Sequence, residues 1–190
     1  MDTTKQKRCN WPKEDALYIK YHDKEWGVPV YEDKKIFEFL LLEIFQAGLS
    51  WITILRKREN FRKAFDDFNY QKIANYSDEK LKYLRQDTGI IRNKLKIKAA
   101  KTNAIAFMKV QKEFGTFSKY LWGFVDGKPI HNAFEKMNEM PANTTLSDKI
   151  SKDLKSRGFK FVGSTIVYAH MQAMGMVNDH TTNCFRYNEV

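Results

Sequence analysis

The chain of 190 residues has only four prolines and nine glycines, and these are spread along it. It contains no linker rich in proline, glycine or serine, and it has no internal repeat. Such features mark boundaries between domains, and a chain of this length can bury one substantial core. We therefore expect a single domain over residues 1–190.

Long hydrophobic runs are also missing. No apolar segment follows the basic start MDTTKQKR, and Glu38 and Glu43 interrupt the longest apolar stretch, residues 36–45. This argues against membrane insertion and export, so we expect a cytoplasmic protein with no membrane partner. We also expect a monomer, because the sequence shows no heptad repeat and no obvious exposed apolar stripe.

Strict alternation of apolar and polar residues is scarce, whereas apolar residues often recur at helical spacing, which predicts an all-α fold. Asp33 is expected to cap a long helix that buries Ile36, Phe37, Leu40, Leu41 and Ile44. Further helices are expected over 50–58, 70–75, 78–86, 93–114, 147–156 and 163–176, with Ser147 as an N-cap and Gly115 as a stop. Residues 123–145, which include Gly127, Pro129 and Pro141, are expected to form surface loops.

Only two cysteines are present, and each has a histidine at a spacing that suits half of a metal site. The pairs are Cys9-x12-His22 and His180-x3-Cys184. Two thiolates and two neutral imidazoles suit a structural Zn²⁺, because their charges cancel and four protein ligands leave no position for a reactive water. Free thiols with unrelated histidines, or one disulfide, remain alternatives at this point.

The chain carries a formal net charge of +10 and a sequence pI of about 9.5, which favours a polyanionic partner such as nucleic acid over a merely solvated basic surface. The segment GIIRNKLKIK at 89–98 is flanked by helical patterns and predicts a helix, tight hairpin and second helix. Its amides could hold a phosphate, with Lys94, Lys98 and Lys101 along one helix face. The alternative is a solvated face. The basic residues Lys152, Lys155, Arg157 and Lys160 share no face and make a weaker case.

Large aromatic side chains gather in the N-terminal third, around the single carboxylate of Glu43. They are Trp11, Tyr18, Tyr21, Trp26 and Trp51. Flat side chains can enclose a planar ligand, and an acid among them is costly unless a salt bridge or a ligand meets it. An aromatic pocket with one acid in a basic protein suggests recognition of an extruded nucleobase, although an ordinary core is the alternative.

Several long motifs then identify a resemblance that covers nearly the whole chain. They are RCNW at 8–11, YIKYHDKEWG at 18–27, QAGLSW at 46–51, GIIR at 89–92, RGFKFVG at 157–163 and VNDH at 177–180. In this order they resemble the bacterial DNA-3-methyladenine glycosylase I family, a zinc-containing branch of the helix-hairpin-helix glycosylases. The resemblance implies that fold, with a zinc clasp joining the N- and C-terminal segments, and a bacterial cytoplasmic protein associated with the nucleoid.

The same resemblance implies the roles of particular residues. Cys9, His22, His180 and Cys184 would bind one structural zinc ion. Trp11, Tyr18, Tyr21, Glu43 and Trp51 would bind the methylated base, with Trp26 supporting the pocket and Glu43 as the catalytic-site acid. Leu49 would enter the DNA, with a packed core leucine as the alternative. The basic segment at 89–98, read from its own pattern, adds Gly89, Ile91, Arg92, Lys94 and Lys98 as residues expected to contact the DNA.

The function that these expectations describe is excision of 3-methyladenine from double-stranded DNA. The N-glycosidic bond would be hydrolysed, free 3-methyladenine released and an abasic site left. The resemblance also implies that the aspartate used by many other helix-hairpin-helix glycosylases is missing, so no general base is assigned. A non-catalytic zinc-containing DNA-binding module and a zinc hydrolase are the rival interpretations. His131 is expected at the surface and His170 in the core.

Overall fold

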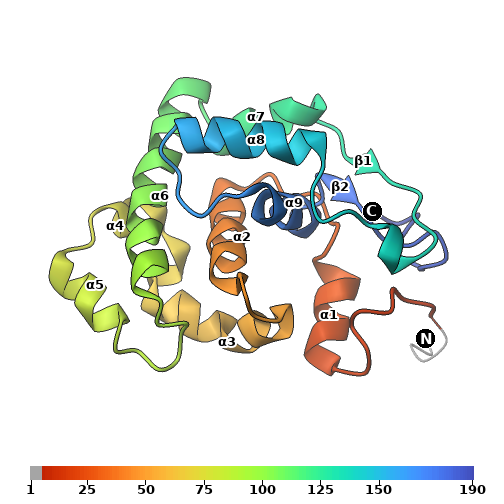
Figure 1. Cartoon of the computed structure of the whole chain (residues 1–190), viewed down its shortest axis with the longest axis horizontal. Helices are drawn as coiled ribbons and strands as arrows, with labels where there is room; N and C mark the ends of the chain where they lie inside the picture. The colour runs from red at the N-terminus through yellow and green to blue at the C-terminus, as the bar shows by residue number, and fades with distance from the viewer. Residues whose placement is uncertain (1–5) are drawn as a thin grey trace.

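The computed structural model describes residues 6–190, and over these residues it is mostly helical, with very little strand (Figure 1). The helices are α1 (Ala16–Lys24), α2 (Asp33–Gln46), α3 (Trp51–Ala64), α4 (Tyr70–Ala74), α5 (Asp78–Leu84), α6 (Lys94–Phe114), α7 (Phe117–Trp122), α8 (Thr145–Ser156) and α9 (Ser164–Ala173). Short 3-10 turns at Asp66–Phe68, Gly123–Val125 and Met137–Glu139 complete the helical elements of residues 6–190. The predicted helical class is confirmed.

Helix α2 lies in the middle of the molecule, with α3, α6 and α9 around it (Figure 1). Every residue from Ile36 to Phe45 is buried, because neighbouring helices cover all sides of α2 rather than one stripe. Phenylalanine supplies much of the surrounding core, with Phe61, Phe65, Phe107 and Phe117 all at most 1 % exposed. A smaller hydrophobic cluster, which includes Tyr21 and Trp26, lies beside this core.

Two predicted helix caps are wrong. Helix α2 is preceded by Glu32 at its N-cap, and Asp33 is its first residue. The Asp33 carboxylate instead accepts the amides of Phe117 and Ser118 at 2.9 and 2.8 Å, so it caps the distant helix α7. Helix α8 is capped by Thr144, and Ser147 Oγ, at the third helical position, accepts a hydrogen bond from the Thr144 amide.

Besides two of the 3-10 turns, the loop-rich region 123–145 carries a strand that the sequence did not predict. Strand β1 (Ile130–His131) pairs in parallel with β2 (Val177–Asn178), with Ile130 opposite Val177. This pairing attaches the 123–145 region to the segment that follows α9, as Figure 1 shows. His131 is exposed and His170 is buried, as expected, and among residues 6–190 no helix is long and apolar enough to cross a membrane.

Candidate functional site

The four residues expected to bind a metal come together in one buried group. Cys9 precedes α1, His22 lies on α1, and His180 and Cys184 follow β2. Their ligand atoms all lie within 4.8 Å of one another. The Cys184 sulfur is 3.5 Å from His22 Nε2 and 3.5 Å from His180 Nδ1, and Cys9 Sγ is 3.6 Å from His180 Nδ1. Tetrahedral zinc with ordinary bond lengths would place sulfur and nitrogen about 3.6 Å apart, so these residues fit such an ion.

Each histidine ring is oriented by a hydrogen bond from the ring nitrogen that faces away from the cysteines. His22 Nδ1 donates to Asp23 Oδ1 at 2.7 Å, and Arg8 holds that carboxylate with an Nη2 to Oδ2 distance of 2.8 Å. His180 Nε2 donates to the carbonyl of Trp26 at 3.1 Å. These bonds leave His22 Nε2 and His180 Nδ1 as the ring nitrogens that face the cysteines, which is the arrangement that outer hydrogen bonds give to metal ligands.

Gly27 allows this close approach. Its φ is +77°, and a Cβ at this position would lie 3.1 Å from the His180 ring. Any larger residue would therefore meet both an unfavourable backbone conformation and a side-chain contact that is too close.

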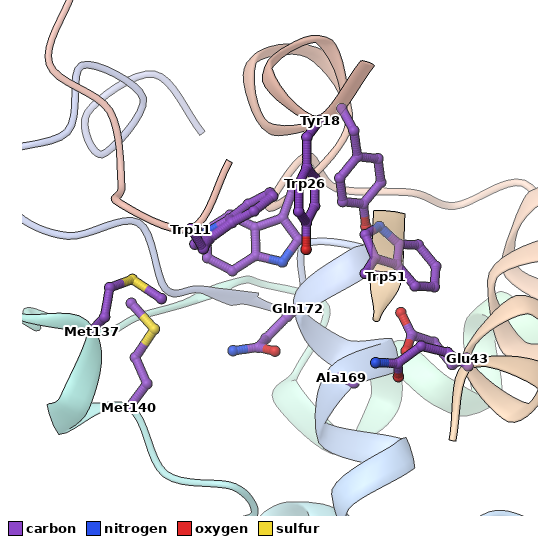
Figure 2. Close-up of a pocket in the computed structure, with 11 residues that line it drawn as sticks. Trp11, Tyr18, Trp26, Glu43, Trp51, Met137, Met140, Ala169 and Gln172 are labelled. Atoms are coloured by element: carbon purple, nitrogen blue, oxygen red, sulfur yellow. The ribbon is translucent and has the colours of Figure 1, made fainter. Parts of the chain in front are cut away.

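A cavity of about 210 Å³ lies next to the metal-binding group. Figure 2 shows Glu43 and Trp51 at one end, Met137 and Met140 at the other, and Trp11, Tyr18 and Trp26 between them. Its volume is below the range of about 300–1,000 Å³ that is usual for drug-sized ligands, which suits a small planar molecule. The residues that line it are Trp11, Tyr18, Tyr21, Trp26, Glu43, Gln46, Trp51, Met137, Met140, Ala169 and Gln172.

The aromatic rings contact one another around this cavity. Trp11 has its ring centroid 4.7 Å from that of Tyr18 and 5.2 Å from that of Trp26, both edge to face. Tyr21 and Trp51 are 5.4 Å apart. The indole nitrogens of Trp11 and Trp51 are buried and have no hydrogen-bond partner among residues 6–190. The expected aromatic residues therefore all line one cavity, and they also belong to or pack against the smaller hydrophobic cluster.

Glu43 is 4 % exposed, and within the described chain no group forms a hydrogen bond or ion pair with its carboxylate. Burial raises its pKa to about 8. The neighbouring Glu38 on the same helix behaves differently: burial alone would raise its pKa, but the charges of Arg58, Lys35 and Arg62 lower it. The salt bridge considered for Glu43 is therefore absent from the described residues, and its acid lines the cavity without a partner.

Sequence reasoning did not identify the far wall of the cavity. Met137 and Met140 come from the loop-rich region, and Ala169 and Gln172 come from α9. No local pattern marked them, because only the packing of α9 and the 3-10 turn against the N-terminal segments brings them to the aromatic residues.

The residues predicted to contact DNA lie outside this cavity. Leu49 is 39 % exposed in the turn between α2 and α3, directly after Gly48, whose φ of +86° forms that turn. Arg92, Lys94 and Lys98 are exposed, and Ile91 is half-buried against the core. The Gly89 amide donates to Asp87 at 2.7 Å, and the Asn93 side chain caps the first turn of α6. The Lys101 ammonium is bound to the Tyr76 carbonyl.

The comparisons with known proteins agree with this geometry. A model of the methyladenine glycosylase family matches residues 11–187. The chain is 48 % identical over 180 residues to DNA-3-methyladenine glycosylase 1 of Escherichia coli K12, covering 95 % of this chain and 96 % of that protein.

Two solved structures are similar along most of the chain. A crystal structure of 3-methyladenine DNA glycosylase I has a TM-score of 0.92 and 49 % identity, covering 94 % of this chain and 98 % of that one. A variant of 3-methyladenine DNA glycosylase I, solved in complex with 3-methyladenine, has a TM-score of 0.91 and 35 % identity over 94 % and 96 % of the two chains. The protein described here belongs to the methyladenine glycosylase family.

Proposed function

We propose that this protein is a DNA-3-methyladenine glycosylase, which extrudes 3-methyladenine from duplex DNA and hydrolyses its N-glycosidic bond. The observation that carries this proposal is the acid of Glu43, which has no hydrogen-bond or ion-pair partner among residues 6–190 and lines an aromatic cavity of a family member. The products are free 3-methyladenine and an abasic site in the DNA. The expectation of a monomer remains a prediction.

The cavity suits a cationic base. 3-Methyladenine in DNA carries a positive charge, so its glycosidic bond is weak and the enzyme needs selection more than strong protonation. The faces of Trp11, Tyr18, Tyr21 and Trp51 attract a cationic ring more than a neutral one. Once ionised, Glu43 accepts hydrogen bonds from the base and adds a charge of the opposite sign. Damaged pairing makes extrusion of the lesion less costly than extrusion of a normal base.

We propose that Cys9, His22, His180 and Cys184 bind one structural zinc ion. The ion would supply a fixed connection between the N-terminal segment and the segment after β2. Four protein ligands complete a tetrahedral shell, so this site offers no open position for a reactive water. That argument disfavours the zinc hydrolase interpretation.

The DNA backbone is proposed to contact two adjoining parts of the surface. Arg92, Lys94 and Lys98 supply exposed positive charge on and before α6. A surface groove continues from Lys98 to Lys160 and Phe161, in the connection between α8 and α9. Leu49 would enter the duplex at the position that the base vacates.

The helix-hairpin-helix unit itself is better supplied by α8, residues 157–163 and α9 than by the α5–α6 region. Helices α8 and α9 pack together, and Ser151 holds the connection through the Val162 carbonyl at 2.6 Å. Within the described part of the chain, no side chain caps the N-terminus of α9, whereas the Asn93 side chain accepts amides of the first turn of α6. Free amides at a helix N-terminus suit a phosphate.

The proposal is tested by incubating the purified protein with methylated duplex DNA and identifying the released bases by chromatography. We expect free 3-methyladenine, with 7-methylguanine left in the DNA. Binding of DNA without any base release would instead support a non-catalytic DNA-binding module.

A further inference from the structure

Gln172 is a polar residue of the cavity wall for which the proposed function gives no role. It lies on α9, and Figure 2 shows its amide near Ala169, in the space between the two methionines and Glu43. Its Nε2 donates to Asp179 Oδ2 at 2.8 Å. Its Oε1 has no hydrogen-bond partner among residues 6–190.

Asp179 fixes which end of this amide is available. It is 1 % exposed, and it also accepts the Tyr168 hydroxyl at 2.7 Å and the Asn132 side-chain amide at 2.7 Å. An ionised carboxylate only accepts hydrogen bonds, so the nitrogen of Gln172 must face Asp179. The oxygen is then the atom that remains for a ligand. A glutamine with no such neighbour could turn its amide and offer either atom.

We propose that Gln172 is a specificity-determining residue whose Oε1 accepts an N–H of the bound base, and that Asp179 is its positioning residue. This inference rests on the proposed function, because it assigns a second acceptor to the same cavity. Glu43 on α2 and Gln172 on α9 approach the cavity from different helices, so they would contact different groups of one base.

A fixed acceptor in the cavity discriminates between bases according to whether they present a donor or an acceptor to it. A base that turns an N–H toward Gln172 gains a hydrogen bond, whereas a base that turns a carbonyl toward it places two acceptors against each other. Because Asp179 prevents the amide from turning, Gln172 cannot relieve that conflict by offering its nitrogen. The pair therefore excludes a class of bases that aromatic faces alone would admit.

The test is a titration of the folded protein with free 3-methyladenine, followed by its intrinsic tryptophan fluorescence. Gln172→Met keeps the length of the side chain and removes the acceptor, so we expect the Kd to rise about tenfold. Tyr168→Phe is the matched control, because it removes another donor from the same Asp179 oxygen at a residue outside the cavity wall. We expect it to change the Kd less than about twofold.

The positioning role is tested by a double-mutant cycle. Asp179→Ala should raise the Kd in the wild-type background and have little further effect in the Gln172→Met background. Equal effects in both backgrounds would show a merely structural role and overturn that assignment. If Asp179→Ala does not fold, Asp179→Asn takes its place in the cycle.

The two proposals fail in different ways. Absence of base release by the wild-type protein would overturn the proposed function. Base release together with an unchanged Kd for Gln172→Met would overturn only the assignment of Gln172.

Discussion

The rings of Trp26 and His180 lie edge to face, with centroids 4.6 Å apart and an interplanar angle of 78°. Trp26 lines the cavity and His180 belongs to the metal-binding group, so the cavity wall packs directly against a proposed metal ligand. Trp11 makes a second connection, because its ring centroid is 5.2 Å from that of His22. The metal site and the base site therefore form one packed unit.

Removal of the metal should weaken both stability and base binding. Replacing Cys184 by alanine leaves three ligands, and a loss of about 3 kcal/mol would lower the Tm by about 6–12 °C. We also expect weaker binding of 3-methyladenine, because Trp26 and Trp11 lose their support. His131→Ala is the control, since this histidine is exposed and lies outside the group. Full metal content in Cys184→Ala, measured by atomic absorption, would contradict the ligand assignment.

Glu43→Gln should stabilise the free protein at alkaline pH. Burial raises the pKa of Glu43 from 4.5 to about 8, so between these values the folded protein keeps a proton that the unfolded chain releases. The free energy of unfolding therefore falls as the pH rises through this window, by a total on the order of 3–5 kcal/mol. Glutamine carries no such penalty.

Urea unfolding of both proteins at about pH 6 and about pH 9 measures this difference, which should grow with pH. Glu38→Gln is the control, because its expected change in the free energy of unfolding has the opposite sign. It removes one of the two carboxylate charges that pair with the buried Arg58, whose Nε lies 2.7 Å from Glu38 Oε1, and should destabilise the protein. A stability difference for Glu43→Gln that does not change with pH would contradict the assigned pKa.

The same substitution should alter catalysis in a pH-dependent way. Only the ionised acid attracts the cationic base, so kcat/KM should rise with pH through an apparent pKa near 8. Glu43→Gln should lack this rise and lose about 10- to 100-fold in kcat/KM at alkaline pH. Release of 3-methyladenine across the pH range provides the measurement. Identical pH profiles for the two proteins would remove Glu43 from the recognition of charge.

Leu49→Ala should separate DNA opening from base binding. Because Leu49 is 39 % exposed, its truncation should change the free energy of unfolding by less than about 0.5 kcal/mol. Excision from duplex DNA should fall about tenfold, while the Kd for free 3-methyladenine stays the same. Leu17, which is 40 % exposed on α1, is the matched control. Unchanged excision by Leu49→Ala would show that Leu49 does not enter the duplex.

Lys96 and Lys98 lie two residues apart on α6 and should give opposite results. The buried Lys96 ammonium donates to the carbonyls of Phe45 and Ala47 at 3.3 and 3.0 Å, at the C-terminal end of α2. Lys96→Met should cost about 1–3 kcal/mol, measured by urea unfolding, because those carbonyls lose their donor. Lys98→Met should leave stability unchanged and weaken DNA binding, measured at fixed salt. Equal effects of the two substitutions on stability would contradict this assignment.

The sequence predicted most helices well because their apolar periodicity and local breakers agree. Gly115 ends α6 with a φ of +85°, as its position indicated. The sequence did not predict α1 or α7. The two wrong N-caps arose because the predicted residue lies close to the true N-cap. Asp33 lies one position after Glu32 and Ser147 lies three positions after Thr144, and each side chain forms another hydrogen bond there. A one-dimensional pattern cannot show that Asp33 caps a helix more than eighty positions away.

The sequence predicted part of the candidate site as well. The Cys and His spacing indicated the metal-binding group, and the cluster of aromatic residues around Glu43 indicated one side of the cavity. Gln172, Met137 and Met140 carry no pattern of their own, because their place depends on how α9 and a 3-10 turn pack. Asp179 could be recognised as an anchor only from its three donors.

The metal-binding group also sets the order in which this protein can mature on the ribosome. Cys9 and His22 leave the ribosome long before His180 and Cys184, because His180 lies 171 residues after Cys9 in the sequence. Trp26 therefore remains without the imidazole of His180 until that part of the chain has been synthesised. Nascent chains should acquire helices before they acquire a competent cavity, so a chain released early would fold in part without becoming able to bind the base.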